Sequence, residues 1–207
     1  MPTLKSILKE VKKELTQKDS VRENAQQNMR KATSLSKQSI LLMHQKKHEK
    51  ARKTIETAKE IISKLQGSAK ENPDSINSGM FSATLQEYSE ANIFQGLIQE
   101  SRFVTPDEIN VPAVDYVLGL ADVIGEYRRL VLDVLREGDA ERGEAYLKTM
   151  DEAYMLVPGL RRKCDVARRI IETTRGDVTQ EVRRKSLENY LKQFEKAQRK
   201  KRQLPKG

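Results

Sequence analysis

Apolar side chains recur at helical spacing along most of the chain, and no segment alternates as a β-strand does. Between residues 3 and 65 they follow steps of three and four, as from Leu4 to Leu15, and no proline or glycine interrupts them. This pattern predicts one or two long helices. The polar run QKKHEK at 45–50 is the expected break between them, and Gly67 is the expected C-cap of the second.

Proline and glycine mark the remaining turns. Residues 66–79 have the composition of a loop, and SRFVTPDEINVP at 101–112 indicates a linker with a single turn, because a residue that precedes proline is pushed out of the α region. The expected helices are 80–101, Pro112 to Gly138, Asp139 to Val157 with a stop at Pro158-Gly159, 160–174 with a break at Gly176, and Asp177 to Ala197. The sequence thus predicts an all-α, seven-helix antiparallel bundle as a single domain over 1–198, with a disordered basic tail at 199–207.

Composition agrees with this fold and narrows the function. Charged residues make up 33% and aromatic residues 5% of the 207, which is typical of long amphipathic helices with solvated outer faces. The net charge of +9 favours a polyanion such as nucleic acid over a metabolite. No apolar stretch approaches the roughly 20 residues of a membrane span, so we expect no membrane partner. The single cysteine, Cys164, excludes an internal disulfide and a thiolate zinc cluster. Together with an N-terminus that lacks an apolar signal region, it leads us to expect a cytoplasmic protein.

Two of the expected helices carry carboxylates among apolar side chains. On 83–97, Glu87 and Glu90 interrupt an otherwise apolar stripe, and on 115–126, Asp122 and Glu126 are flanked by apolar residues on both sides. A buried carboxylate costs several kcal/mol unless a cation, a hydrogen-bond donor or a metal compensates it. If the two helices pack together, four carboxylates face one another, and hard oxygen ligands without histidine favour Mg²⁺ or Mn²⁺. Acidic pairs at the same spacing also occur on solvated faces, so a purely structural role stays open.

Basic residues provide candidates for nucleic-acid contact. Several follow heptad steps along the first helix, and two come directly after the second acidic pair. The candidates are Arg22, Arg30, Lys37, His44, His48, Arg128 and Arg129. Because aromatic residues are few, base stacking should be limited and binding directed mainly to the backbone. A solvated helix face is the alternative for each residue.

Specific segments resemble the translin superfamily. They are LQEYSEANIFQGLI, TPDEIN, VPAVDYVLGLADVIGEYRR, SKQSILLMHQ and GDAERGEAYLKTMDEAYMLVPG, and the similarity covers about Val21 to Leu191. The likeness is greatest to translin-associated factor X, and the lack of a long insertion after DEIN resembles a compact prokaryotic or archaeal form. This resemblance implies a seven-helix fold, octameric shells and binding of single-stranded nucleic acid.

The same resemblance implies an activity. The acidic residues of the Mg²⁺-dependent endoribonuclease branch match Glu87, Glu90, Asp122 and Glu126, and Asp122 separates that branch from translin itself. We therefore expect an endoribonuclease for single-stranded or partly duplexed RNA that forms a homo-octamer or another homo-oligomer, with single-stranded DNA as a further possible ligand. The alternative is a non-catalytic nucleic-acid-binding scaffold. A diiron or dimanganese redox protein is disfavoured, since no Glu-x-x-His pair occurs.

Overall fold

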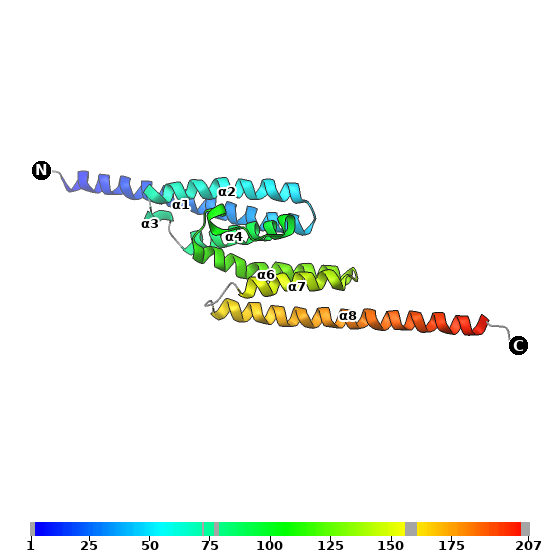
Figure 1. Cartoon of the computed structure of the whole chain (residues 1–207). Coiled ribbons are helices and arrows are strands. Elements are labelled where there is room, and N and C mark those ends of the chain that lie inside the picture. Colours follow the sequence, from blue (N-terminus) through cyan, green and yellow to red (C-terminus); the bar gives the residue numbers. More distant parts are fainter. Residues whose placement is uncertain (1–2, 72, 77–78, 156–160, 204–207) are drawn as a thin grey trace. The chain divides into compact units, whose positions relative to one another are not determined.

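The computed structural model describes residues 3–71, 73–76, 79–155 and 161–203, and every regular element in these ranges is a helix. The helices are α1 (Leu4–His44), α2 (His48–Glu71), α3 (Pro73–Ile76), α4 (Gly79–Glu100), α5 (Pro106–Ile109), α6 (Ala113–Arg136), α7 (Ala140–Met155) and α8 (Arg161–Gln203) (Figure 1). The predicted all-α class is confirmed. Within these ranges, no helix combines the length and apolar content that crossing a membrane requires.

The chain forms two compact units, residues 1–123 and 124–207, which are described separately. In the first unit, α1 and α2 form a helical hairpin against which α4 packs (Figure 1). The break expected in QKKHEK is confirmed, because Lys46 in the turn has a φ of 59°. Met29 from α1, Ile62 from α2 and Phe94 from α4 are almost fully buried and form the centre of this core.

The DEIN segment forms the single turn α5. Pro106 begins it, and Thr105 and Glu108 form a capping box. The Thr105 hydroxyl accepts from the Glu108 backbone N–H at 3.3 Å, and the Thr105 N–H donates to the Glu108 carboxylate at 2.5 Å. Asn110 ends the turn at a φ of 52°, and its side chain donates to Oε1 of Gln66 on α2 at 2.9 Å. The predicted turn is confirmed, and α2 holds it in place.

The second unit contains the end of α6 with α7 and α8. Gly138 follows α6 at a φ of 77°, and the Asp139 carboxylate accepts from the backbone N–H of Arg142 at 3.1 Å, so both predicted boundaries are confirmed. The helices α7 and α8 pack against each other, and the Arg175 guanidinium donates to both carboxylate oxygens of Asp151 at 2.9 and 3.0 Å.

Two expected helix ends are wrong. Gly67 lies inside α2, which continues to Glu71, and Gly176 lies inside α8. A mid-helix glycine costs only about 1 kcal/mol relative to alanine, and burial of Thr174 and Val178 on either side of Gly176 outweighs that cost. The expected stop at Pro158-Gly159 and residues 204–207 of the expected tail lie outside the described residues, while 199–203 continue α8. That residues 1–198 form a single domain stays a prediction.

Candidate functional site

In the first unit, α4 and the beginning of α6 approach each other closely at Gly119. A Cβ atom on Gly119 would lie 2.7 Å from both the Gln86 carbonyl oxygen and Ser89 Cβ, and 2.8 Å from the Glu90 backbone nitrogen. Real Cβ atoms essentially never make contacts this short, so only glycine permits this packing. Around Gly119, the two helices that carry the acidic residues therefore lie in direct contact.

Polar side chains form a ladder along this seam. Ser82, Gln86 and Glu90 recur at steps of four on α4, and the first two contact carboxylates of α6. The Ser82 hydroxyl donates to Asp115 Oδ1 at 2.5 Å, and the Gln86 side-chain amide donates to Asp122 Oδ2. Sequence reasoning missed Ser82 and Gln86. Their spacing from Glu90 was the available signal, since it places all three on one side of the helix.

The acidic residues of the seam differ in their exposure. Glu90 is buried, with 9% of its surface exposed, and Asp122 is half-buried. The Glu87 side chain is 25% exposed, and its Oε1 lies 3.1 Å from Nζ of Lys37 on α1. Lys37 was predicted as a nucleic-acid contact, and the structure places it beside a predicted metal ligand.

Glu126 lies one helical turn after Asp122 on α6 and belongs to the second unit. It is half-buried. Its membership of the predicted ligand set stays a prediction.

The acidic side chains of the seam offer only oxygen donors to a cation. Carboxylate oxygens without histidine or thiolate suit Mg²⁺ or Mn²⁺ better than zinc. In the part of the chain that the structure describes, no three side chains of His, Cys, Asp or Glu are gathered closely enough to hold a metal ion. Protein donors instead meet two of the carboxylates, Lys37 at Glu87 and Gln86 at Asp122. The chemistry of the predicted ligand set fits the cation, and its role as ligands stays a prediction.

The other predicted basic residues of the first unit fall into two groups. Arg22 and Arg30 are exposed on α1. The half-buried His44 ring packs against Phe94, with 5.0 Å between the ring centroids. His48, the first residue of α2, is also half-buried. The arginines are accessible to a polyanion, whereas the His44 ring is part of the packing between α1 and α4.

In the second unit, the two predicted arginines have different surroundings. The Arg128 guanidinium donates to the Thr174 hydroxyl at 2.8 Å and pairs with Asp177 at 3.2 Å, which ties α6 to α8. Arg129 is exposed. The contacts of Arg128 are those of a structural residue, and both nucleic-acid roles stay predictions.

Tyr88 lies between Glu87 and Glu90 in the sequence but points into the core. It is 1% exposed, and burial raises the pKa of its hydroxyl to about 12. The phenol therefore stays protonated at neutral pH and is a core side chain.

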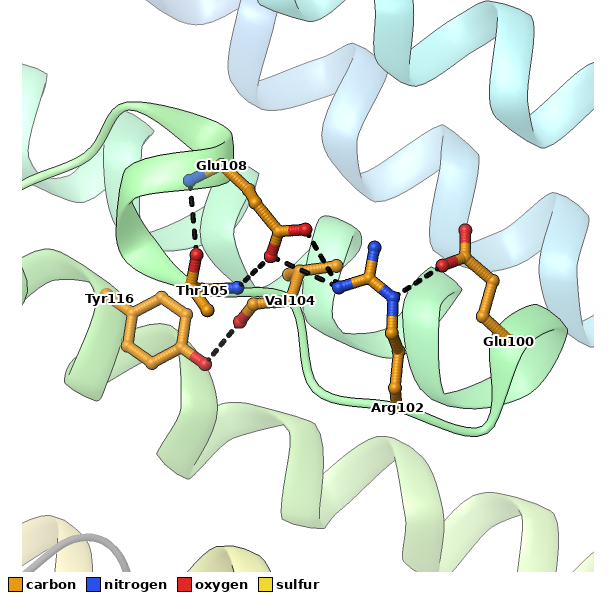
Figure 2. A network of polar contacts seen from close by, with 6 residues as sticks. All are labelled: Glu100, Arg102, Val104, Thr105, Glu108 and Tyr116. Carbon is orange, nitrogen blue, oxygen red and sulfur yellow. Dashed lines mark hydrogen bonds and ion pairs between the residues drawn. The ribbon is translucent and has the colours of Figure 1, made fainter.

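A polar network fixes the loop that joins α4 to α6. Figure 2 shows Arg102 between Glu100 and Glu108. Its guanidinium lies 2.7 Å from the Glu100 carboxylate and 2.9 Å from the Glu108 carboxylate. The Tyr116 hydroxyl, from the first turns of α6, donates to the Val104 carbonyl at 2.6 Å (Figure 2). The network joins the end of α4, α5 and the start of α6, so it helps set the register in which the two acidic helices meet.

Known proteins are similar to this chain in fold and in part of its sequence. Residues 20–197 match the translin family model. The chain is similar to an uncharacterised protein of Methanocaldococcus jannaschii, at 30% identity over 192 residues that cover 87% of this chain and 85% of that protein. It is also similar to the crystal structure of AfC3PO and to the structure of an AfC3PO–duplex RNA complex. Both have a TM-score of 0.74 and 31% identity, and they cover 84% of this chain and 96% and 95% of theirs.

The crystal structure of apo-NeC3PO has a similar fold, with a TM-score of 0.77 at 23% identity over 84% of this chain and 96% of that chain. The family match extends over most of the helical chain and includes the close contact at Gly119 and both acidic pairs. On this evidence, the chain belongs to the translin family.

Proposed function

We propose that this protein is a metal-dependent endoribonuclease that binds and cleaves single-stranded or partly duplexed RNA within a homo-oligomeric shell. The observation that carries the proposal is the α4–α6 seam, where Glu90 and Asp122 come from facing helices at a contact that requires Gly119. Similarity to AfC3PO, which has been solved with duplex RNA, supports RNA as the substrate class.

The residues that would hold Mg²⁺ or Mn²⁺ are Glu87, Glu90, Asp122 and Glu126. Such an ion, when bound, activates water and neutralises charge on a phosphate. The ion would take over part of the compensation that protein donors now give to the carboxylates of Glu87 and Asp122.

The side chains of the seam have separate roles in the proposed hydrolysis. A water oxygen bonds to phosphorus as the bond from phosphorus to the leaving ribose oxygen breaks. A carboxylate accepts the proton of the attacking water, and the leaving oxygen takes up a proton from solvent. We assign that role to Glu87, because its side chain reaches solvent whereas Glu90 is buried. Gln86 orients the Asp122 carboxylate through its amide. With few aromatic residues, binding should tolerate many sequences.

The decisive assay compares a labelled single-stranded RNA with its DNA counterpart, with Mg²⁺ or with a chelator. Asp122→Asn keeps the shape of the side chain and removes its charge. We expect it to slow RNA cleavage by at least the roughly 10- to 100-fold that loss of an outer-shell partner of a metal costs. The matched control is Asp133→Asn, which removes a carboxylate from the same helix at a position where it pairs with Arg136. Equal cleavage by both variants would remove the seam from the mechanism.

A non-catalytic scaffold for single-stranded RNA or DNA is the second candidate. The ion pair between Lys37 and Glu87 favours it, because it neutralises a proposed ligand from within the protein. A scaffold would bind RNA in a salt-sensitive way and leave it intact with either Mg²⁺ or Mn²⁺.

Exposed apolar side chains on the second half of α8 support the homo-oligomer. Leu187, Leu191 and Phe194 recur at steps of four and three and are 50–60% exposed. Such a stripe fits a surface that another subunit covers, whether in an octamer or in a smaller assembly. Native mass spectrometry of the full chain gives the subunit number, and a monomer would refute this part of the proposal.

A further inference from the structure

A shallow groove runs between α1 and α4 in the first unit, beside the acidic seam. It encloses about 460 Å³ and is lined by Arg30, Thr33, Ser34, Lys37, Met80 and Ala83. Arg30, Lys37 and the Ser34 hydroxyl are donors on α1 that suit phosphate oxygens. The Thr33 hydroxyl instead donates to the Thr84 hydroxyl on α4 at 3.1 Å. No ion pair of Arg30 is found among the described residues, and its side chain is exposed. Arg30 and Lys37 therefore place two cations along a groove whose remaining lining is mostly apolar, and these cations can contact backbone phosphates of a nucleic acid.

Lys37 connects this groove to the seam. Its Nζ lies 3.1 Å from Glu87 Oε1, and the side chains are 62% and 25% exposed. An ion pair this exposed contributes little to stability, since most surface pairs are worth no more than about 1 kcal/mol. Lys37 can therefore leave Glu87 for a phosphate oxygen at small cost, and the carboxylate that it leaves is a proposed metal ligand.

We propose that Lys37 is a positioning residue that exchanges between Glu87 in the RNA-free protein and a phosphate of the bound strand. The inference rests on the proposed function and adds a coupling to it. In the absence of RNA, the ammonium group neutralises Glu87 and competes with a divalent cation. When a strand enters the α1–α4 groove, a phosphate takes the ammonium group, and Glu87 becomes available.

Thermodynamic linkage gives this exchange a measurable form. If RNA binding frees a metal ligand, RNA must tighten divalent-cation binding, and the cation must tighten RNA binding by the same factor. Because the ion pair is worth no more than about 1 kcal/mol, we expect a coupling of up to about 5-fold, at the lower end of the usual range for such pairs of sites. A residue that only contacts RNA would weaken RNA binding when removed and leave metal affinity unchanged, so the two affinities separate the roles.

The experiment measures Mn²⁺ affinity by electron paramagnetic resonance, with and without a 2′-O-methyl RNA that resists cleavage, after subtracting Mn²⁺ bound by the RNA alone. For Lys37→Met, we expect Mn²⁺ to bind as tightly without RNA as the wild type binds it with RNA. We also expect RNA affinity to fall, and the slope of its logarithm against the logarithm of salt concentration to decrease by about one phosphate contact. Lys59→Met is the matched control. Lys59 also pairs with a glutamate, Glu56, on an exposed helix face, at 3.7 Å.

Arg30→Gln provides a second control inside the groove. It should weaken RNA binding yet keep the coupling, because Arg30 does not contact Glu87. Mn²⁺ binding that is lost in Glu90→Gln but unchanged in Lys37→Met would overturn the exchange and leave the proposed metal site standing. If neither the wild type nor any variant bound Mn²⁺ at the seam, the metal-dependent function itself would fail, and the exchange with it.

Discussion

Replacement of Gly119 by alanine tests the packing on which the site depends. The added methyl group would lie 2.7 Å from the carbonyl oxygen of Gln86 and 2.8 Å from the backbone nitrogen of Glu90. Both are main-chain atoms of α4, so no rotamer change can relieve the overlap. The helices must move apart, and the acidic residues that face one another across the seam must move with them.

The structure allows the size of this effect to be estimated. Overpacking of a close contact costs about 1–3 kcal/mol, and overlap with two main-chain atoms puts Gly119→Ala near 3. Alanine regains about 1 kcal/mol through its helix propensity. The net loss is therefore about 2 kcal/mol in the free energy of unfolding, which corresponds to a fall in Tm of about 4–8 °C for a chain of this size.

Thermal unfolding followed by circular dichroism provides the assay, with Gly67→Ala as the matched control. Gly67 lies inside α2, and nothing lies within 4 Å of the Cβ position there. That variant should gain about 0.5–1 kcal/mol from propensity alone. If Gly119→Ala also raised the Tm, the close approach of α4 and α6 would be refuted. At a temperature where both variants are folded, we expect Gly119→Ala alone to lose RNA cleavage.

Three further predictions concern charge and burial. The backbone N–H of Thr105 lowers the pKa of Glu108 in the folded protein. The Glu108 carboxylate therefore stabilises the fold above pH 4.5, and this stabilisation is lost as the pH falls through the lower folded pKa. Measured against pH, the Tm of Glu108→Gln should lie below that of the wild type at pH 7 and approach it in acid. Burial raises the pKa of Tyr88 to about 12, so the stabilisation from its protonated phenol is present below pH 10 and is lost between pH 10 and 12. In an ultraviolet titration, Tyr88→Phe should lack one phenol that ionises at high pH. Arg128→Met should cost about 1–2 kcal/mol in urea unfolding through lost hydrogen bonds to α8. The exposed neighbour variant Arg129→Met should change stability by less than about 0.5, and equal effects of the two would contradict the described contacts.

Local signals in the sequence predict helix ends well where the backbone leaves the α region. Gly138 has a φ of 77°, which favours glycine, and the corresponding helix end was predicted. Gly67 and Gly176 have the same residue type inside a helix, where burial of neighbouring side chains decides the outcome. Sequence alone does not distinguish the two situations, because the cost of a helical glycine is smaller than the gain from packing.

The sequence indicated the acidic residues of the candidate site but not the side chains that contact them. Helical period identifies which residues share one side of a helix, so Glu90 and Asp122 could be recognised as acids on apolar helices. It does not give the rotation of one helix against its neighbour. The contacts from Gln86 to Asp122 and from Lys37 to Glu87 depend on that rotation. In the sequence, Gln86 looked like an ordinary polar position and Lys37 like a nucleic-acid contact.

These donors bear on whether the fold needs a divalent cation. Carboxylates on packed helices require compensation, and the chain supplies it at Asp122 through Gln86 and at Glu87 through Lys37. The protein should then fold without metal, and Mg²⁺ at ten times its Kd would add only about 1.4 kcal/mol by mass action. We expect a chelator to abolish RNA cleavage, to lower the Tm by a few degrees at most and to leave the helical circular dichroism intact. Unfolding on chelation would show that the ion, and not the protein donors, holds the acidic helices together.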